Sequence, residues 1–132
     1  MMKRIAWALA LTAALLLASC GGGGGGGAVK IGMIYNMTGS QASLDSPSAN
    51  GAKLAAKEIN AAGGVLGKKI SLVAYDGKSD AATIANSATQ LAQSDKVVAM
   101  LGFSDSDMVM AAAPVAAKAG IVFVTSGATS PK

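Results

Sequence analysis

The sequence predicts an α/β fold built on a parallel, right-handed sheet of about four strands with three intervening helices. Short runs rich in β-branched and aromatic residues alternate with longer segments whose apolar residues recur at helical spacing. Clusters of Gly, Asn, Asp and Ser separate these segments, as expected of turns. One short run is almost continuously apolar, which is typical of a strand covered on both faces of a parallel sheet.

The first predicted strand is Val29–Tyr35, and a loop of small polar residues follows it over Asn36–Asp45. Ser46 is expected to cap the first helix, with Pro47 at the first helical position. Gly63-Gly64 is expected to end this helix. Its core-facing stripe is predicted from four apolar residues at helical spacing: Ala52, Ala55, Ile59 and Ala62.

The second strand is predicted at Lys69–Tyr75, and Asp76-Gly77 is expected to form a turn. Asp80 is the expected N-cap of a second helix. The apolar run at Val97–Leu101 predicts the third strand, which Gly102 closes. The apolar face of the second helix is formed by Ile84, Ala88, Leu91 and Ala92.

A third helix is predicted from about Ser106 to Ala119, with a kink at Pro114, and Ile121–Thr125 is the fourth strand. In a parallel sheet, ligands bind outside the carboxyl ends of the strands, where loops meet helix N-termini. Turns favour the same small polar residues as such sites, so each loop alone also has a purely structural interpretation. Together the loops predict a site for a small polar ligand at 36–45, 102–106 and 126–129.

Composition excludes several classes of function. The 132 residues are 52% hydrophobic, 4% aromatic and carry a formal net charge of +4, without a basic stripe or aromatic platform for nucleic acid. The chain has no histidine and a single cysteine, Cys20, which excludes a Cys/His zinc cluster, a Ser-His-Asp triad and an internal disulfide. We therefore expect no enzyme, cofactor or metal site, although Ser/Lys and carboxylate schemes of catalysis remain open.

The N-terminus has the layout of an export signal. Lys3 and Arg4 precede an apolar run over residues 5–18, which is too short for a membrane-spanning helix. Leu17-Ala18-Ser19-Cys20 resembles the bacterial lipobox, so residues 1–19 are the predicted signal peptide and Cys20 the lipidated N-terminus. Residues 20–27, with seven consecutive glycines, are then a tether. We expect a lipid-anchored protein outside the cytoplasm.

Two stretches are specific in combination: Glu58 to Gly67, with the sequence E-I-N-A-A-G-G-V-L-G, and Ser126 to Pro131, with the sequence S-G-A-T-S-P. With these stretches the chain resembles the type I periplasmic binding proteins of branched-chain amino-acid ABC transporters. The resemblance extends over nearly all of Val29–Lys132. Shorter matching stretches are Lys30-Ile31-Gly32, Met37-Thr38-Gly39, Asn50-Gly51-Ala52, Ala112-Ala113-Pro114 and Ala119-Gly120-Ile121.

The resemblance implies two Rossmann-like lobes that close on a ligand, of which residues 28–132 supply most of lobe one. It further implies a substrate-binding lipoprotein that captures a branched-chain amino acid, or a related amino-acid-like solute, and passes it to permease subunits. A ligand-binding subunit of a sensory or regulatory system is the alternative, because receptors reuse this fold. Permease and ATPase genes beside this one would distinguish the two.

The resemblance also assigns site residues. It implies that Ser106 binds the ligand carboxylate, and that Gly127, Ala128 and Thr129 supply groups to the carboxylate and the ammonium. Leu44 stands where amino-acid-binding members carry an aromatic wall of the side-chain pocket, which leaves the solute's identity open. Members with a disulfide in this lobe have cysteines at the places of Ser79 and Asp105. Asp105 and Asp107 flank the expected carboxylate site, either as solvated loop charges or as partners of a cationic ligand group.

Overall fold

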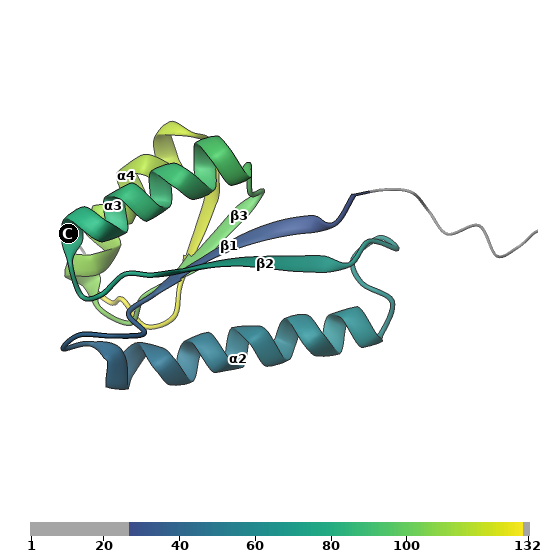
Figure 1. Ribbon diagram of the computed structural model, residues 1–132, viewed down its shortest axis with the longest axis horizontal. Coiled ribbons are helices and arrows are strands. Elements are labelled where there is room, and N and C mark those ends of the chain that lie inside the picture. Colours follow the sequence, from purple (N-terminus) through teal and green to yellow (C-terminus); the bar gives the residue numbers. More distant parts are fainter. Residues whose placement is uncertain (1–26, 131–132) are drawn as a thin grey trace, which may run out of the picture.

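A computed structural model describes residues 27–130, and it confirms the predicted α/β fold with a four-stranded, fully parallel sheet (Figure 1). The strand order is β2-β1-β3-β4, so the first strand lies inside the sheet and the fourth at its edge. The strands are β1 (Val29–Tyr35), β2 (Ile70–Asp76), β3 (Ala99–Gly102) and β4 (Val122–Thr125). The helices are α2 (Ala42–Ala61), α3 (Ala81–Gln90), η2 (Leu91–Asp95) and α4 (Ser106–Lys118).

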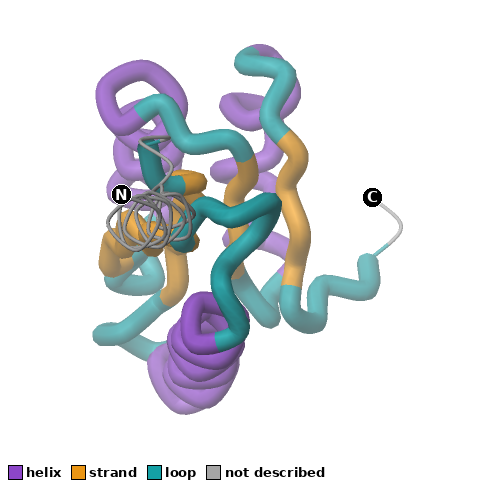
Figure 2. The backbone as a smooth tube through the Cα atoms, turned by 90° about the vertical axis from the view of Figure 1, so that its right-hand side faces the viewer, coloured by secondary structure: helices purple, strands orange, loops and turns teal. Residues whose placement is uncertain are grey.

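The helices divide unequally between the two faces of the sheet. α2 packs alone against β1 and β2, whereas α3 and α4 pack together on the opposite face (Figure 2). On the α2 side of the sheet, Leu101 of β3 packs against the cluster that contains Ala49 of α2, whereas within residues 27–130 the side of β4 that faces this way is exposed. Val122 and Val124 project there from β4 and are 65% and 51% exposed.

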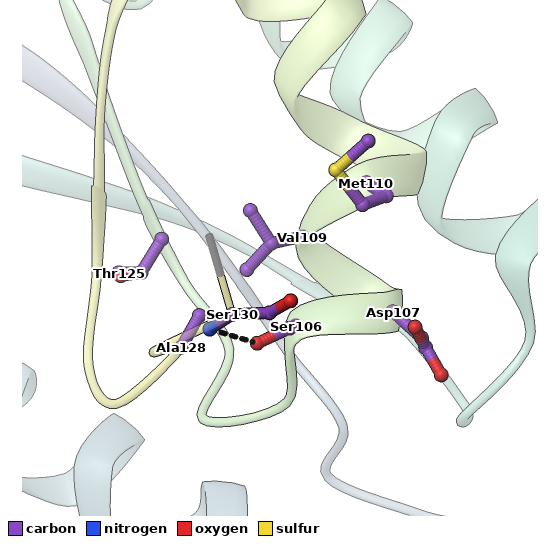
Figure 3. A pocket seen from close by; sticks show the side chains of 7 residues that line it. All are labelled: Ser106, Asp107, Val109, Met110, Thr125, Ala128 and Ser130. Atoms are coloured by element: carbon purple, nitrogen blue, oxygen red, sulfur yellow. Dashed lines mark hydrogen bonds between the residues drawn. The ribbon is translucent and has the colours of Figure 1, made fainter. Parts of the chain in front are cut away.

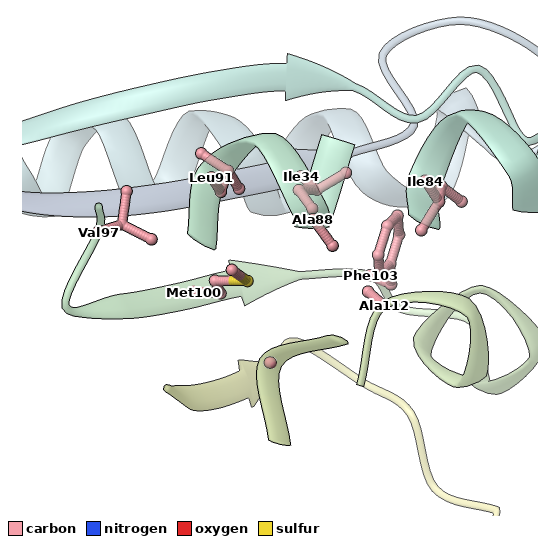
Figure 4. Close-up of a cluster of buried hydrophobic side chains, with 9 residues drawn as sticks. Ile34, Ile84, Ala88, Leu91, Val97, Met100, Phe103 and Ala112 are labelled. Atoms are coloured by element: carbon pink, nitrogen blue, oxygen red, sulfur yellow. The ribbon is translucent and has the colours of Figure 1, made fainter. Parts of the chain in front are cut away.

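The main hydrophobic core lies between the sheet and the α3–α4 layer (Figure 4). Phe103 is fully buried there and meets Phe123 edge to face, with ring centroids 6.4 Å apart. The predicted core residues of the second helix are confirmed, since three of them are buried and Ala92 packs against them. The buried members are Ile34, Ile84, Ala88, Leu91, Val97, Met100, Phe103, Ala112 and Ala116.

The start of the first helix differs from the prediction. α2 begins at Ala42, so Ser46 is not its N-cap and Pro47 lies inside it. The Leu44 and Asp45 amides donate to the Gln41 carbonyl oxygen, which opens the helix one turn early and places Asp45 on its inner face. Since Asp45 is buried, the helix turns its Asp45, Ala49 and Ala56 side inward, and the predicted core positions Ala55, Ile59 and Ala62 are exposed.

The connection into the third strand also differs. The second helix begins at its predicted cap, where the Asp80 carboxylate accepts from the Thr83 amide at 2.7 Å. It then continues as a turn of π-helix, η2, which Lys96 ends in the left-handed conformation at φ 56°. The Val97 amide closes this turn by donating to the Leu91 carbonyl oxygen at 3.1 Å, and β3 begins at Ala99 rather than at Val97.

None of the helices in the part of the chain that the structure describes is long and apolar enough to cross a bilayer. The predicted signal peptide, residues 1–19, and the lipidation site Cys20 lie outside the described residues. Of the predicted tether, residues 20–27, only Gly27 is described.

Candidate functional site

Four loops meet at the carboxyl edge of the sheet, where β1, β2, β3 and β4 end. A buried pair of polar residues, Asn36 and Asp45, ties three of them together. The Asp45 carboxylate accepts hydrogen bonds from the Asn36 backbone amide and side-chain Nδ2, both at 2.9 Å, and from the Ser104 amide at 2.8 Å. The Asn36 Oδ1 accepts in turn from the Ser79 amide at 2.8 Å. Side-chain hydrogen bonds, in addition to packing, therefore hold the loops of this edge together.

Asp76, the last residue of β2, organises the loop after β1. Its carboxylate accepts from the amides of Met37, Thr38 and Lys78, and from the Thr38 hydroxyl at 2.7 Å. Partial burial acts to raise the pKa of Asp76, but these hydrogen bonds, led by that of Thr38, outweigh it and lower the pKa below its ordinary value of 3.8. Asp76 is thus an anion that holds a loop, not a proton donor.

Two further contacts fasten the loops. Gln41 donates from its amide to the Ser79 Oγ at 3.0 Å and from its Nε2 to the Asp105 Oδ2 at 3.3 Å. The resemblance implies that some family members carry a disulfide between the positions of Ser79 and Asp105. In this chain the Gln41 side chain and amide connect these two residues by hydrogen bonds instead. Tyr35 and Ser126 share a 2.6 Å hydrogen bond that joins the end of β1 to the loop after β4.

The first turn of α4 carries the polar groups of the candidate site. Asp105 is its N-cap and accepts from the Asp107 amide at 2.8 Å, which favours the structural interpretation of this carboxylate. The Ser106 Oγ accepts from the Ser130 amide at 3.1 Å. Because a hydroxyl donates one proton as well as accepting, Ser106 is oriented by this bond and can still donate to an anionic oxygen.

A small pocket of about 140 Å³ opens at this turn, between α4 and the segment after β4 (Figure 3). Ser106, Thr125 and Asp107 give it a polar side, while Val109 and Met110 from the next turn of α4 give it an apolar side. Residues 27–130 contain no cluster of His, Cys, Asp or Glu arranged to hold a metal ion. The lining comprises Ser106, Asp107, Val109, Met110, Thr125, Ala128 and Ser130.

The structure brings some of the predicted site residues together and leaves others apart. Ser106 and Ala128 both line the pocket, although 22 positions separate them in the sequence. Gly127 lies against the loop after β3, since a Cβ built on it would stand 3.6 Å from Ser104. Thr129 is exposed beside the pocket, and Leu44 lies in the first turn of α2, 56% exposed, without lining it.

Sequence reasoning missed the apolar side of the pocket. Val109 and Met110 belong to the predicted third helix, but their spacing does not distinguish a core face from a pocket face. It also missed the role of Asp45, which was expected at the end of the polar loop after the first strand and is instead buried.

Comparison with known proteins places these features in a family. The amino acid binding protein of Pseudomonas aeruginosa is 38% identical over 104 residues, which are 79% of this chain and 28% of that protein. The branched-chain amino acid transporter substrate binding protein LivJ of Streptococcus pneumoniae, solved with isoleucine, is 39% identical at a TM-score of 0.77. The matched part covers 79% of this chain and 30% of LivJ.

An ABC transporter substrate-binding protein of Desulfitobacterium hafniense, solved with Leu, matches at 34% identity and a TM-score of 0.68. The match covers 78% of this chain and 30% of that one, so the chain spans less than a third of the length of these relatives. A family model described as periplasmic binding protein matches residues 28–132. The chain therefore belongs to the periplasmic binding protein family, and its fold is that of one lobe.

Proposed function

We propose that this chain forms the ligand-binding edge of lobe one in a substrate-binding lipoprotein of an ABC transporter, which captures a branched-chain amino acid or a related amino-acid-like solute. The pocket at the first turn of α4 is the observation that carries this proposal. Its polar side fits the charged end of an amino acid, and its apolar side, Val109 and Met110, fits an aliphatic side chain. The two solved relatives bind isoleucine and Leu.

Each group of such a ligand has a candidate partner. The Ser106 hydroxyl donates to the carboxylate at the positive end of the α4 helix dipole. The segment Gly127 to Thr129 adds backbone groups and a hydroxyl around the charged end. Asp107 brings a negative charge to the pocket, which favours a ligand that also carries a cation. Leu44, at the same edge of the sheet, contacts the ligand side chain once the lobes close.

The role is binding rather than catalysis. The pocket is lined by hydroxyls, one carboxylate and aliphatic side chains, a set that orients a ligand. The second lobe of the full-length protein supplies the remaining contacts. The permease subunits of the transporter are the protein partners.

The experiment is a calorimetric titration of the full-length protein with leucine and isoleucine, and with analogues that lack either charged group. We expect binding of both amino acids, and a loss of about tenfold or more when the carboxylate or the ammonium is removed, because a partner group then stays buried without its hydrogen bond. Equal affinity for the truncated analogues would show that this edge does not recognise an amino acid.

Cys20 is proposed as the lipid-bearing N-terminus outside the cytoplasm, on the sequence of the lipobox and the apolar segment before it. Growing cells with a radioactive fatty acid should label the wild-type protein and leave Cys20→Ser unlabelled. The same amount of label on both proteins would refute the anchor.

A further inference from the structure

Opposite ends of the sheet carry opposite charges. At the carboxyl edge, five aspartates stand against one lysine, and at the amino edge six lysines stand against two acids within residues 27–130. We call the amino edge the tether end, because β1 begins there. The carboxyl-edge residues are Asp45, Asp76, Asp80, Asp105, Asp107 and Lys78. The tether-end residues are Lys30, Lys57, Lys68, Lys69, Lys96, Lys118, Glu58 and Asp95.

Helix capping explains part of this distribution. Asp80 and Asp105 cap helix N-termini, and at the tether end Lys30 and Lys69 donate to the carbonyl oxygens of Asp95 and Asn60. Lys68 stands in the turn before β2, away from any helix end, whereas Lys96 is the C-cap of η2. The positive field of the tether end therefore exceeds what the helix ends require.

The tether end also presents an apolar tip. Leu66 is 97% exposed and is held there by a tight turn in which Val65 and Lys68 exchange two backbone hydrogen bonds of 2.8 and 2.9 Å. Leu66 adopts a left-handed conformation with φ 51°, between Gly64 and Gly67, which also have positive φ. The fold thus fixes a leucine side chain in solvent, where it contributes nothing to the core and costs backbone strain.

The tip lies beside the first strand. The Val29 amide donates to the Lys69 carbonyl oxygen at 2.9 Å, so the turn and the start of β1 are neighbours (Figure 1). Figure 2 looks directly onto this end of the molecule. Only eight residues separate Cys20 from Val29, and eight residues span at most about 28 Å.

We propose that the tether end is a membrane-contacting surface, in which Leu66 enters the headgroup region of an anionic bilayer and the lysines of this end face its phosphates. An exposed apolar residue at the same end of the fold as several basic side chains is favoured at such interfaces. The acidic carboxyl edge is then repelled from the bilayer, which keeps the ligand pocket exposed to solvent. The proposal rests on the proposed function in one respect, namely that a lipid on Cys20 brings this end to the membrane.

The test uses the mature chain from residue 20 with Cys20→Ser, so that no lipid contributes. Co-sedimentation compares vesicles of phosphatidylcholine mixed with phosphatidylglycerol and vesicles of phosphatidylcholine alone. We expect binding to the anionic vesicles only, weakened by salt, and lowered about fivefold by Leu66→Ser or Lys68→Gln. Leu54→Ser and Lys78→Gln are the matched controls, since Leu54 is exposed in the middle of α2 and Lys78 lies at the acidic end.

Tryptophan fluorescence provides a second measurement of vesicle binding, which applies even if little protein co-sediments with the vesicles. The single tryptophan of residues 1–132, Trp7, lies before residue 20, so Leu66→Trp or Leu54→Trp introduces the sole tryptophan of residues 20–132. We expect anionic vesicles to shift the emission of Trp to the blue at position 66 and not at position 54. Equal blue shifts at positions 66 and 54, or equal binding to neutral and anionic vesicles, would contradict the proposed membrane-contacting surface. Since the protein tested carries no lipid, that result would leave the labelling experiment on Cys20 unaffected.

Discussion

Asp45 is the residue on which the geometry of the candidate site depends most. Its carboxylate is fully buried and satisfies three donors from two different loops, Asn36 N, Asn36 Nδ2 and Ser104 N. A buried carboxylate is stable only when such donors surround it. Ser104 lies two residues before Ser106, so Asp45 positions the loop that delivers the Ser106 hydroxyl to the pocket.

Replacement of this carboxylate should destabilise the whole edge. Asp45→Ala leaves the buried Asn36 amide and the partly buried Ser104 amide without an acceptor, and we expect it to lower the free energy of unfolding by about 3 kcal/mol. Urea denaturation followed by circular dichroism measures the change. Asp107→Ala is the control, because this carboxylate is exposed and its loss should cost less than about 1 kcal/mol. Equal losses would show that the buried network contributes no special stability.

The sequence could not reveal this role. Aspartate within a run of Ser, Gln and Gly is typical of a solvated loop, and a charged residue is rarely buried. Its burial depends on donors from residues 9 and 59 positions away, which no local pattern shows. Ser106 and Ala128, by contrast, were placed correctly at one edge, because the carboxyl ends of parallel strands must lie together.

At the scale of elements, the contact between β1 and η2 sets how closely the helix layer approaches the sheet. A Cβ on Gly32 would stand 2.7 Å from Leu91 Cδ1, and Leu91 is fully buried in the main core. Gly32 is therefore required where the π-helical turn crosses the strand. Gly51, in the exposed part of α2, has open space where a Cβ would be.

The two glycines should respond in opposite directions to alanine. We expect Gly32→Ala to lower the free energy of unfolding by about 1–3 kcal/mol, since Leu91 must move within a packed core. Gly51→Ala should raise it by about 0.5–1 kcal/mol, because alanine restricts the unfolded chain and favours a helix. Thermal melts of both variants give the comparison. A stabilised Gly32→Ala protein would mean that the layer has room for a methyl group.

The order and type of the helices and strands could be predicted because the spacing of apolar residues differs between strands and helices and is visible in a single sequence. The predicted boundaries of helices and strands were wrong where tertiary contacts determine where an element begins. α2 starts at Ala42 because Gln41 and Asp45 bond to distant loops, and β3 starts late because η2 extends the second helix. The buried side of α2 was misjudged for the same reason, since the helix turns to bury a carboxylate rather than its most apolar stripe.

At the scale of the whole molecule, the parallel sheet separates the two proposed functions. Its carboxyl edge holds the candidate pocket, and its amino edge carries the lysines and Leu66. The chain spans less than a third of the length of its relatives, and one lobe buries a ligand from one side only. Under the proposed function, affinity therefore depends on both lobes, while the orientation of the ligand's charged end depends on residues of this one.

Titration calorimetry with isoleucine tests this account most directly, using full-length protein carrying Ser106→Ala, Thr129→Ala or the control Ser94→Ala, which lies in η2 at the opposite end of the sheet. We expect the first two variants each to weaken binding by about 1–3 kcal/mol, since a charged group of the ligand loses a hydrogen bond in a buried site. Their melting temperatures should stay close to that of the control. Wild-type affinity in Ser106→Ala and Thr129→Ala, with unchanged melting, would contradict the assignment of the ligand to this edge.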